Sequence, residues 1–103
     1  MKEYTIEAVR WFDKVNGNTY HSCRITRHKD GAELACPLQY GYGDQYRQTA
    51  LSAMVEAGWL KGYDKETVYR YERENDNPIV WIVSDGLKRE AIALAEMTLP
   101  FIK

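Results

Sequence analysis

The stretch RWFDKVNGNTYHS, from Arg10 to Ser22, carries the pair Asn16-Gly17 between two segments in which apolar and polar residues loosely alternate. An Asn-Gly pair in that setting is the strongest short-range signal for a β-hairpin. We therefore predict two antiparallel strands, Glu3–Phe12 and Thr19–Arg27, joined at this turn.

A two-residue turn at Asn16-Gly17 sets the pairing of these strands. The predicted pairs are Phe12 with His21, Arg10 with Cys23 and Ala8 with Ile25 on one face, while the other face carries Val9, Trp11, Tyr20 and Arg24. Both faces mix apolar and polar residues, so the sequence leaves open which face is buried. A turn that differs by one residue would reverse the pairing.

Downstream of the hairpin, turn signals and periodicity predict five more elements. They are the strand Glu33–Leu38, the helix Gln45–Ala57, the strands Thr67–Glu72 and Ile79–Val83, and the helix Leu87–Met97. The first helix has a stripe at helical spacing made of Ala50, Leu51, Met54 and Val55. Asp44 fits its N-cap, and Gly58 followed by Trp59 fits a Schellman ending.

The predicted order of elements is βββαββα, and the chain contains no internal repeat or linker. This order favours one α+β domain over residues 1–103, with an antiparallel sheet of about five strands and two helices packed on one face of that sheet. A chain of 103 residues has the size of one domain with a small core. Formation of a homodimer would enlarge that core.

The charges are balanced, with 14 Lys and Arg against 15 Asp and Glu. A net charge of -1 indicates no general attraction to nucleic-acid backbones or anionic membranes. No window approaches the apolar length of a membrane span, and the N-terminal segment lacks the apolar core of a signal peptide. We expect a cytoplasmic protein with no membrane partner.

Four potential zinc ligands, His21, Cys23, His28 and Cys36, match no closed zinc motif, and buried thiols are the better interpretation of the cysteines. Residues two apart on a strand are about 7 Å apart, too far for His21 to activate Cys23 as a nucleophile. No hydrolase, metalloprotease, phosphate-loop or dinucleotide signature is present. We expect no metal, no cofactor and no enzymatic activity.

The stretch YGYGDQYRQTA, from Tyr40 to Ala50, is the candidate binding surface. Tyr, Trp and Arg side chains anchor protein interfaces because they offer a large contact area at low entropic cost. We therefore predict that Tyr40, Tyr42, Tyr46 and Arg47 contact a protein partner. A phosphate-binding loop is disfavoured, because a carboxylate at Asp44 would compete for the same helix N-terminus.

The alternative is a nucleic-acid-binding module that uses the first hairpin. Arg10, Arg24, Arg27 and Lys29, with Trp11 or Tyr20, would then form a modest basic and aromatic face. Such binding would weaken steeply with salt.

Together, RWFDKVNGNTYHS and YGYGDQYRQTA resemble a group of small uncharacterised proteins encoded by phages and prophages, over roughly residues 9–60. In that group an NGNTYH hairpin precedes a YGYG-type loop and a helix. The resemblance implies a phage accessory protein that works inside a bacterial cell. Such proteins often bind and inhibit or modulate a host protein, including components of defence or transcription. The resemblance assigns no catalytic or binding residue.

Overall fold

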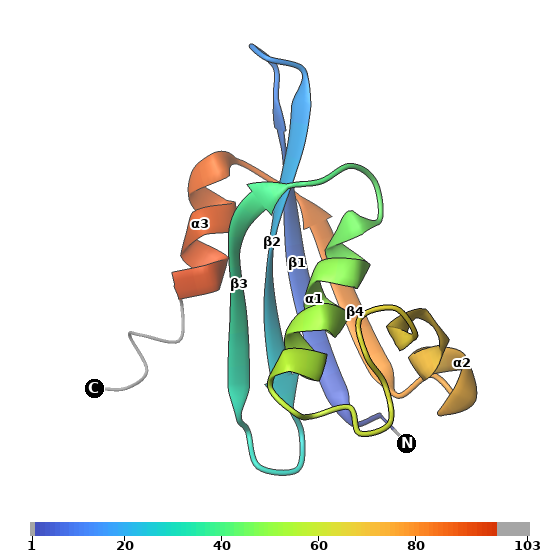
Figure 1. Ribbon diagram of the computed structural model, residues 1–103. Helices are drawn as coiled ribbons and strands as arrows, with labels where there is room; N and C mark the ends of the chain where they lie inside the picture. Colours follow the sequence, from blue (N-terminus) through green and yellow to red (C-terminus); the bar gives the residue numbers. More distant parts are fainter. Residues whose placement is uncertain (1, 97–103) are drawn as a thin grey trace.

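The computed structural model describes residues 2–96, which form an α+β fold built on one four-stranded sheet (Figure 1). Its elements are β1 (Tyr4–Asp13), β2 (Asn18–Arg27), β3 (Glu33–Tyr40), α1 (Gln45–Glu56), the 3-10 helix η1 (Val68–Arg70), α2 (Tyr71–Glu74), β4 (Ile79–Asp85) and α3 (Lys88–Glu96). The strand order is β3-β2-β1-β4. The first three strands are antiparallel, whereas β4 runs parallel to β1.

The hairpin is present, but its turn has four residues, 14–17, and Asp13 pairs with Asn18. The Asp13 carboxylate accepts hydrogen bonds from the backbone N–H groups of Val15 and Asn16 at 3.0 and 3.3 Å, and Gly17 adopts a φ of 71°. These bonds favour the longer turn over the predicted two-residue turn.

The longer turn shifts the strand register by two residues. Arg10 pairs with His21 and Ala8 pairs with Cys23, so the predicted pairs are wrong. Side chains alternate with a period of two, and every residue therefore stays on the face of the sheet that the sequence predicted.

The helices α1 and α3 cover opposite faces of the sheet, and the prediction of two helices on one face is wrong (Figure 1). The thiol of Cys23 lies 3.6 Å from the carbonyl oxygen of Tyr46 in α1. Its neighbour Ser22 donates a hydrogen bond to the carbonyl oxygen of Ala91 in α3. Because adjacent residues on a strand point to opposite faces, each face has its own helix.

The main core lies between the sheet and α1. Its buried members are Tyr4, Ile6, Ala8, Cys23, Ile25, Cys36, Tyr46, Ala50, Leu51, Met54, Leu60, Val68, Tyr71 and Ile79. On the other face, Ala91 and Leu94 of α3 are buried. Coverage of both faces explains why apolar residues occur on both faces of the hairpin.

The ends of α1 lie close to the predicted positions. Gly58 has a φ of 77°, and its N–H donates to the carbonyl of Val55. The N–H of Trp59 donates to the carbonyl of Met54. These two bonds form the predicted Schellman ending. Asp44 occupies the N-cap position but makes no side-chain capping hydrogen bond, contrary to the prediction.

The segment predicted as a strand at Thr67–Glu72 is helical instead, and it forms η1 and the start of α2. The carboxylate of Asp64 accepts hydrogen bonds from the N–H groups of Glu66 and Thr67, both at 2.9 Å, which starts a helical turn. As a result, the sheet has four strands among the described residues.

The strand predicted at Ile79–Val83 is confirmed and extends to Asp85, but it pairs with β1 in parallel. The chain crosses over through α1 and α2 and returns to the end of the sheet where β1 begins, so that Pro78 accepts hydrogen bonds from Glu3 and Tyr4. The predicted helix Leu87–Met97 corresponds to α3, and its last residue, Met97, lies outside the described residues. Within residues 2–96, no helix is long and apolar enough to cross a membrane.

We expect both thiols to be protected in the folded protein. Cys23 and Cys36 are free, buried and directly opposite each other on β2 and β3. The hydrogen bond to Cys36, together with burial, raises the pKa of the Cys23 thiol, which keeps it protonated. Reaction with Ellman's reagent should therefore proceed at the rate of unfolding in buffer and within seconds in concentrated guanidinium. Rapid reaction of either thiol in buffer would contradict this packing.

Candidate functional site: an aromatic surface at the hairpin end

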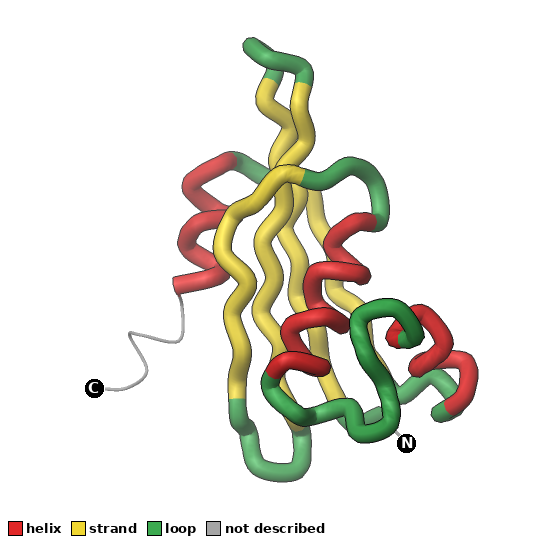
Figure 2. The backbone as a smooth tube through the Cα atoms, in the orientation of Figure 1, coloured by secondary structure: helices red, strands yellow, loops and turns green. Residues whose placement is uncertain are grey.

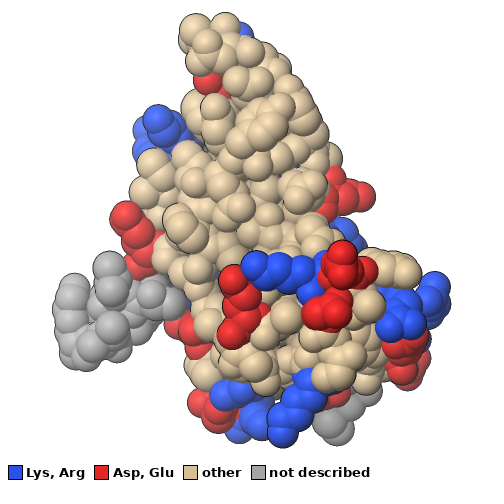
Figure 3. All heavy atoms as spheres, in the orientation of Figure 1, with Lys and Arg blue, Asp and Glu red and all other residues tan. Residues whose placement is uncertain are grey.

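Exposed apolar side chains are concentrated at one end of the sheet, which we call the hairpin end. It consists of Trp11, Phe12, Val15, Tyr20, Tyr40, Tyr42 and Leu87. Five of these are among the eight large apolar side chains exposed within residues 2–96; the other three exposed ones are Tyr69, Ile82 and Ile92. In Figure 3 the upper part of the molecule, where this end projects, is mostly free of charged side chains.

Four aromatic rings form a row across the hairpin end. The ring centroids of Trp11 and Tyr20 are 5.3 Å apart, those of Tyr20 and Tyr40 5.8 Å, and those of Tyr40 and Tyr42 5.2 Å. The first three residues are cross-strand partners on β1, β2 and β3, on the face of the sheet that α3 covers. Contacts between neighbouring rings hold each side chain in place, so the row is a fixed surface.

The first residues of α3 flank this row. Lys88 places its amino group 5.5 Å from the centre of the Trp11 ring, a cation–π contact that fixes the indole. Leu87 precedes the helix and is 50% exposed.

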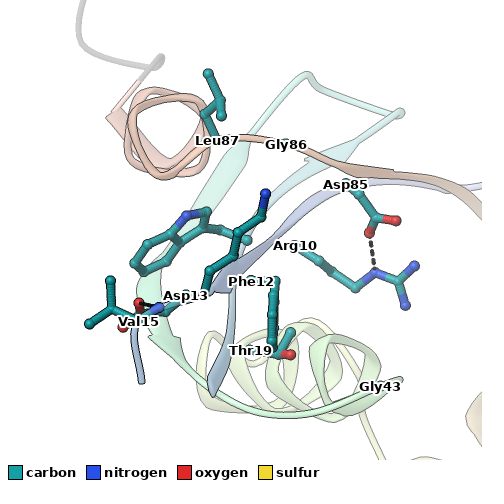
Figure 4. Close-up of a pocket in the computed structure, with 11 residues that line it drawn as sticks. Arg10, Phe12, Asp13, Val15, Thr19, Gly43, Asp85, Gly86 and Leu87 are labelled. Carbon is teal, nitrogen blue, oxygen red and sulfur yellow. Dashed lines mark hydrogen bonds and ion pairs between the residues drawn. The ribbon is translucent and has the colours of Figure 1, made fainter. Parts of the chain in front are cut away.

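A hollow of about 700 Å³ lies beside the row, where β1 continues past the end of β4. Its lining includes Phe12 and Leu87, which come from opposite faces of the sheet, and Thr19 (Figure 4). Arg10 and Asp85 form an ion pair at its edge, with Nε and Oδ1 2.9 Å apart (Figure 4). The apolar surface therefore wraps around the free edge of β1.

Gly41 sets the path of the chain between Tyr40 and Tyr42. A Cβ atom at Gly41 would lie 2.7 Å from Cε1 of His21 and 2.6 Å from Cγ of Gln45, so any side chain would clash. The N–H of Gly41 donates to Thr19 at 3.0 Å, which continues the β2–β3 pairing beyond Tyr40. Tyr40 and Tyr42 thereby stay side by side.

His21 lies buried beneath Gly41, and its Nε2 atom is 2.8 Å from the hydroxyl of Thr49 in α1. Burial lowers the pKa of His21, and this effect outweighs a backbone hydrogen bond with Gly41 that raises it. The neutral imidazole is thus part of the support for the aromatic row.

The four predicted anchors divide into two pairs. Tyr40 and Tyr42 are each 54% exposed and belong to the row. Tyr46 is only 6% exposed and packs edge-on against Trp81, on the face of the sheet opposite the row. We therefore do not include Tyr46 in the proposed binding surface. Arg47 lies 4.4 Å above the Trp81 ring and pairs with Glu72, away from the row.

The residues of the nucleic-acid alternative do not share a surface. Arg10 is paired with Asp85, and Arg24 is buried and bonded to Glu33 at 2.6 Å. Arg27 and Lys29 lie at the opposite end of the sheet from Trp11 and Tyr20, which belong to the hairpin end. No single basic and aromatic face results from these six side chains.

The four candidate zinc ligands do not meet at one site. His21 contacts Thr49, while Cys23 contacts Cys36 and the backbone of Tyr46. His28 lies at the other end of β2, where its ring contacts Thr5. Within residues 2–96, no three His, Cys, Asp or Glu side chains come together in a way that could hold a metal ion.

Replacement of Tyr42 and of Tyr46 by alanine should have very different effects on stability. The Tyr42 hydroxyl makes only 3.4 Å contacts with Gly17 and Asn18, so Tyr42→Ala should cost about 1 kcal/mol or less. Tyr46→Ala opens a cavity in the core and should cost about 3–5 kcal/mol. Urea denaturation of both variants tests this difference, and equal losses would contradict the assignment of Tyr42 to the surface.

Stability should fall when the pH is lowered from about 7 to about 5. The unfolded chain takes up a proton on His21 near its ordinary pKa of about 6.5, whereas the folded protein resists protonation because its pKa is lowered. The free energy of unfolding is therefore largest above that range and declines below it. Arg27 lowers the pKa of Asp30 to about 2, so the stability that this carboxylate provides is present above about pH 4 and is lost only below that pH.

Thermal melting at several pH values measures this effect, with His28→Gln as the matched control. His21→Gln should flatten the profile between pH 7 and 5, and His28→Gln should leave it sloped. A slope that survives in His21→Gln would show that another group is responsible.

Comparison of this chain with protein-family models, with curated proteins and with solved structures found no match.

Proposed function

We propose that this protein is a small binding module that docks onto another protein through the hairpin end. The observation that carries the proposal is the concentration of exposed apolar and aromatic side chains on a fixed row beside a hollow of about 700 Å³. Interface cores are enriched in Tyr, Trp and Phe, and the row at the hairpin end has this enrichment, while the charged residues Arg10, Asp13, Lys14 and Asp85 also line the hollow beside it.

Charge favours a protein partner over a nucleic acid. The basic groups next to the row are few, and Arg10 is already neutralised by Asp85. Single-stranded nucleic acid requires a positive groove along which bases stack on aromatic faces. The rings of Tyr40 and Tyr42 meet at 77°, so they do not present parallel faces for successive bases.

The expected partner surface is apolar and carries a protruding side chain or helix face that enters the hollow. Phe12 and Leu87 would supply apolar contacts from the two sides of β1, and the ion pair between Arg10 and Asp85 would lie at the polar rim. The resemblance to phage accessory proteins suggests a bacterial host protein as the partner, with inhibition or modulation of that protein as the outcome.

Affinity capture from a bacterial lysate, followed by mass spectrometry, tests the proposal. The double variant Phe12→Ala/Tyr42→Ala should lose at least about 90% of the captured partner, because truncation of interface anchors typically costs 2 kcal/mol or more. Tyr69→Ala is the matched control, since Tyr69 is 69% exposed but lies away from the hairpin end. This control should retain full capture.

Two results would overturn the proposal. One is undiminished capture by a double variant whose melting temperature matches that of the unmodified protein. The other is an equal loss in Tyr69→Ala. Analytical ultracentrifugation shows whether the occupant is a second copy, because the double variant would then abolish a concentration-dependent dimer.

A further inference from the structure

A second hollow, of about 750 Å³, lies at the end of the sheet opposite the hairpin end. It is lined by Lys2, Glu3, Tyr4, Arg27, His28, Lys29, Gly58, Trp59 and Lys61. These residues come from the start of β1, the turn between β2 and β3, and the loop after α1, which gather at the lower end of the molecule (Figure 2). We call this hollow the basal pocket.

The charge of the basal pocket is opposite to that of the whole chain. Lys2, Arg27, Lys29 and Lys61 carry positive charge against the carboxylates of Glu3 and of Asp30, which pairs with Arg27. The whole chain has a net charge of -1. Like charges held around one hollow repel each other, and an anion bound between them relieves that repulsion.

The wall of the basal pocket is fixed by packing. The guanidinium of Arg27 lies 4.3 Å above the Trp59 ring, while its nitrogen atoms bond to Asp30 at 3.0 and 2.7 Å. Trp59 is held in turn by Tyr4, at a ring-centroid distance of 5.9 Å, and by the Schellman hydrogen bond to Met54. Arg27 is thus oriented before any ligand binds.

His28 ties the strand ends together on the other side of the basal pocket. Its Nε2 atom lies 2.7 Å from the hydroxyl of Thr5, and its Nδ1 atom lies 3.1 Å from the carbonyl oxygen of Lys2. These contacts link β2 to the start of β1 and keep the lining segments in place.

Two lysines at the mouth of the basal pocket are available for a ligand. Lys29 is in the β2–β3 turn, Lys61 follows α1, and both are exposed. Neither forms an ion pair within 4.0 Å with a carboxylate of residues 2–96. Their ammonium groups can therefore bind an anion without breaking an existing pair.

We propose that the basal pocket binds a small multivalent oxyanion of the polyphosphate type. Lys29 and Lys61 would bind the outer oxygens, and the preformed Arg27 and Trp59 pair would form the wall behind them. A concave pocket, in a chain whose remaining surface carries a net negative charge, suits a compact anion better than an extended nucleic-acid backbone. The pocket is about 30 Å from the hairpin end at the usual rise along the ten residues of β1, so the two sites are independent.

Titration with inorganic pyrophosphate at low ionic strength, followed by calorimetry and by amide chemical shifts, tests this proposal. Shifts should be confined to the β2–β3 turn, the start of β1 and the loop after α1. Lys29→Ala/Lys61→Ala should weaken binding about tenfold or more, because two charge-assisted contacts are lost. Both lysines are exposed, so the melting temperature should not change.

Lys14→Ala/Lys65→Ala is the matched control, because it removes the same charge from outside the basal pocket. This control should bind pyrophosphate as the unmodified protein does. The proposal is overturned if pyrophosphate causes no localised shifts, or if the control loses as much affinity as Lys29→Ala/Lys61→Ala. It is also overturned if a single-stranded oligonucleotide binds more tightly than pyrophosphate and shifts residues well beyond the pocket.

Discussion

The pairing of β1 with a strand on each side is the constraint on which the rest of the structure depends. β1 pairs with β2 over all ten of its residues, but with β4 only from Tyr4 to Arg10. Because β4 ends at Asp85, the last part of β1 projects beyond it with one edge uncovered. Trp11 and Phe12 are on this overhang, on opposite faces: Trp11 is half-buried beside Lys88 of α3, whereas Phe12 is 53% exposed. The free edge at the end of β1, beside the hollow, is therefore a consequence of the unequal lengths of two paired strands.

Local patterns in the sequence predicted the first half of the fold well. The alternation of β1 and β2 assigned side chains to the correct faces even though the register was wrong by two residues, since a shift of two preserves the face. The same reasoning applies to the tyrosines. Tyr46 is four residues before Ala50 and eight before Met54, so it continues the predicted apolar stripe of α1 into the core. Tyr40 ends β3 and Tyr42 lies in the loop before the helix, so neither continues that stripe.

The remaining features depend on contacts that a linear pattern does not contain. The run Val68–Tyr71 has the β-branched and aromatic character of a strand, but the Asp64 carboxylate starts a helical turn there, and local capping outweighs weak strand propensity. The parallel pairing of β4 follows from a long crossover through α1 and α2. Leu87 joins the hairpin end, and Lys61 joins the basal pocket, only because distant segments meet in space.

The nearly neutral net charge conceals a division of the surface along the axis of β1. Apolar and aromatic side chains collect where β1 ends, whereas Lys2, Arg27, Lys29 and Lys61 line the basal pocket where it begins. Charged side chains of both signs occupy the lower half of the molecule in Figure 3. The side chains at each end are held by contacts within that end: the row by ring packing and Lys88, the basal pocket by Trp59 and His28. Within the described residues, both the sheet and α1 run between the two ends: Gly43 before α1 lines the hollow at the hairpin end, and Gly58 after it lines the basal pocket. The proposed anion and the proposed protein partner would therefore occupy separate surfaces, and each proposal can be tested by its own measurement.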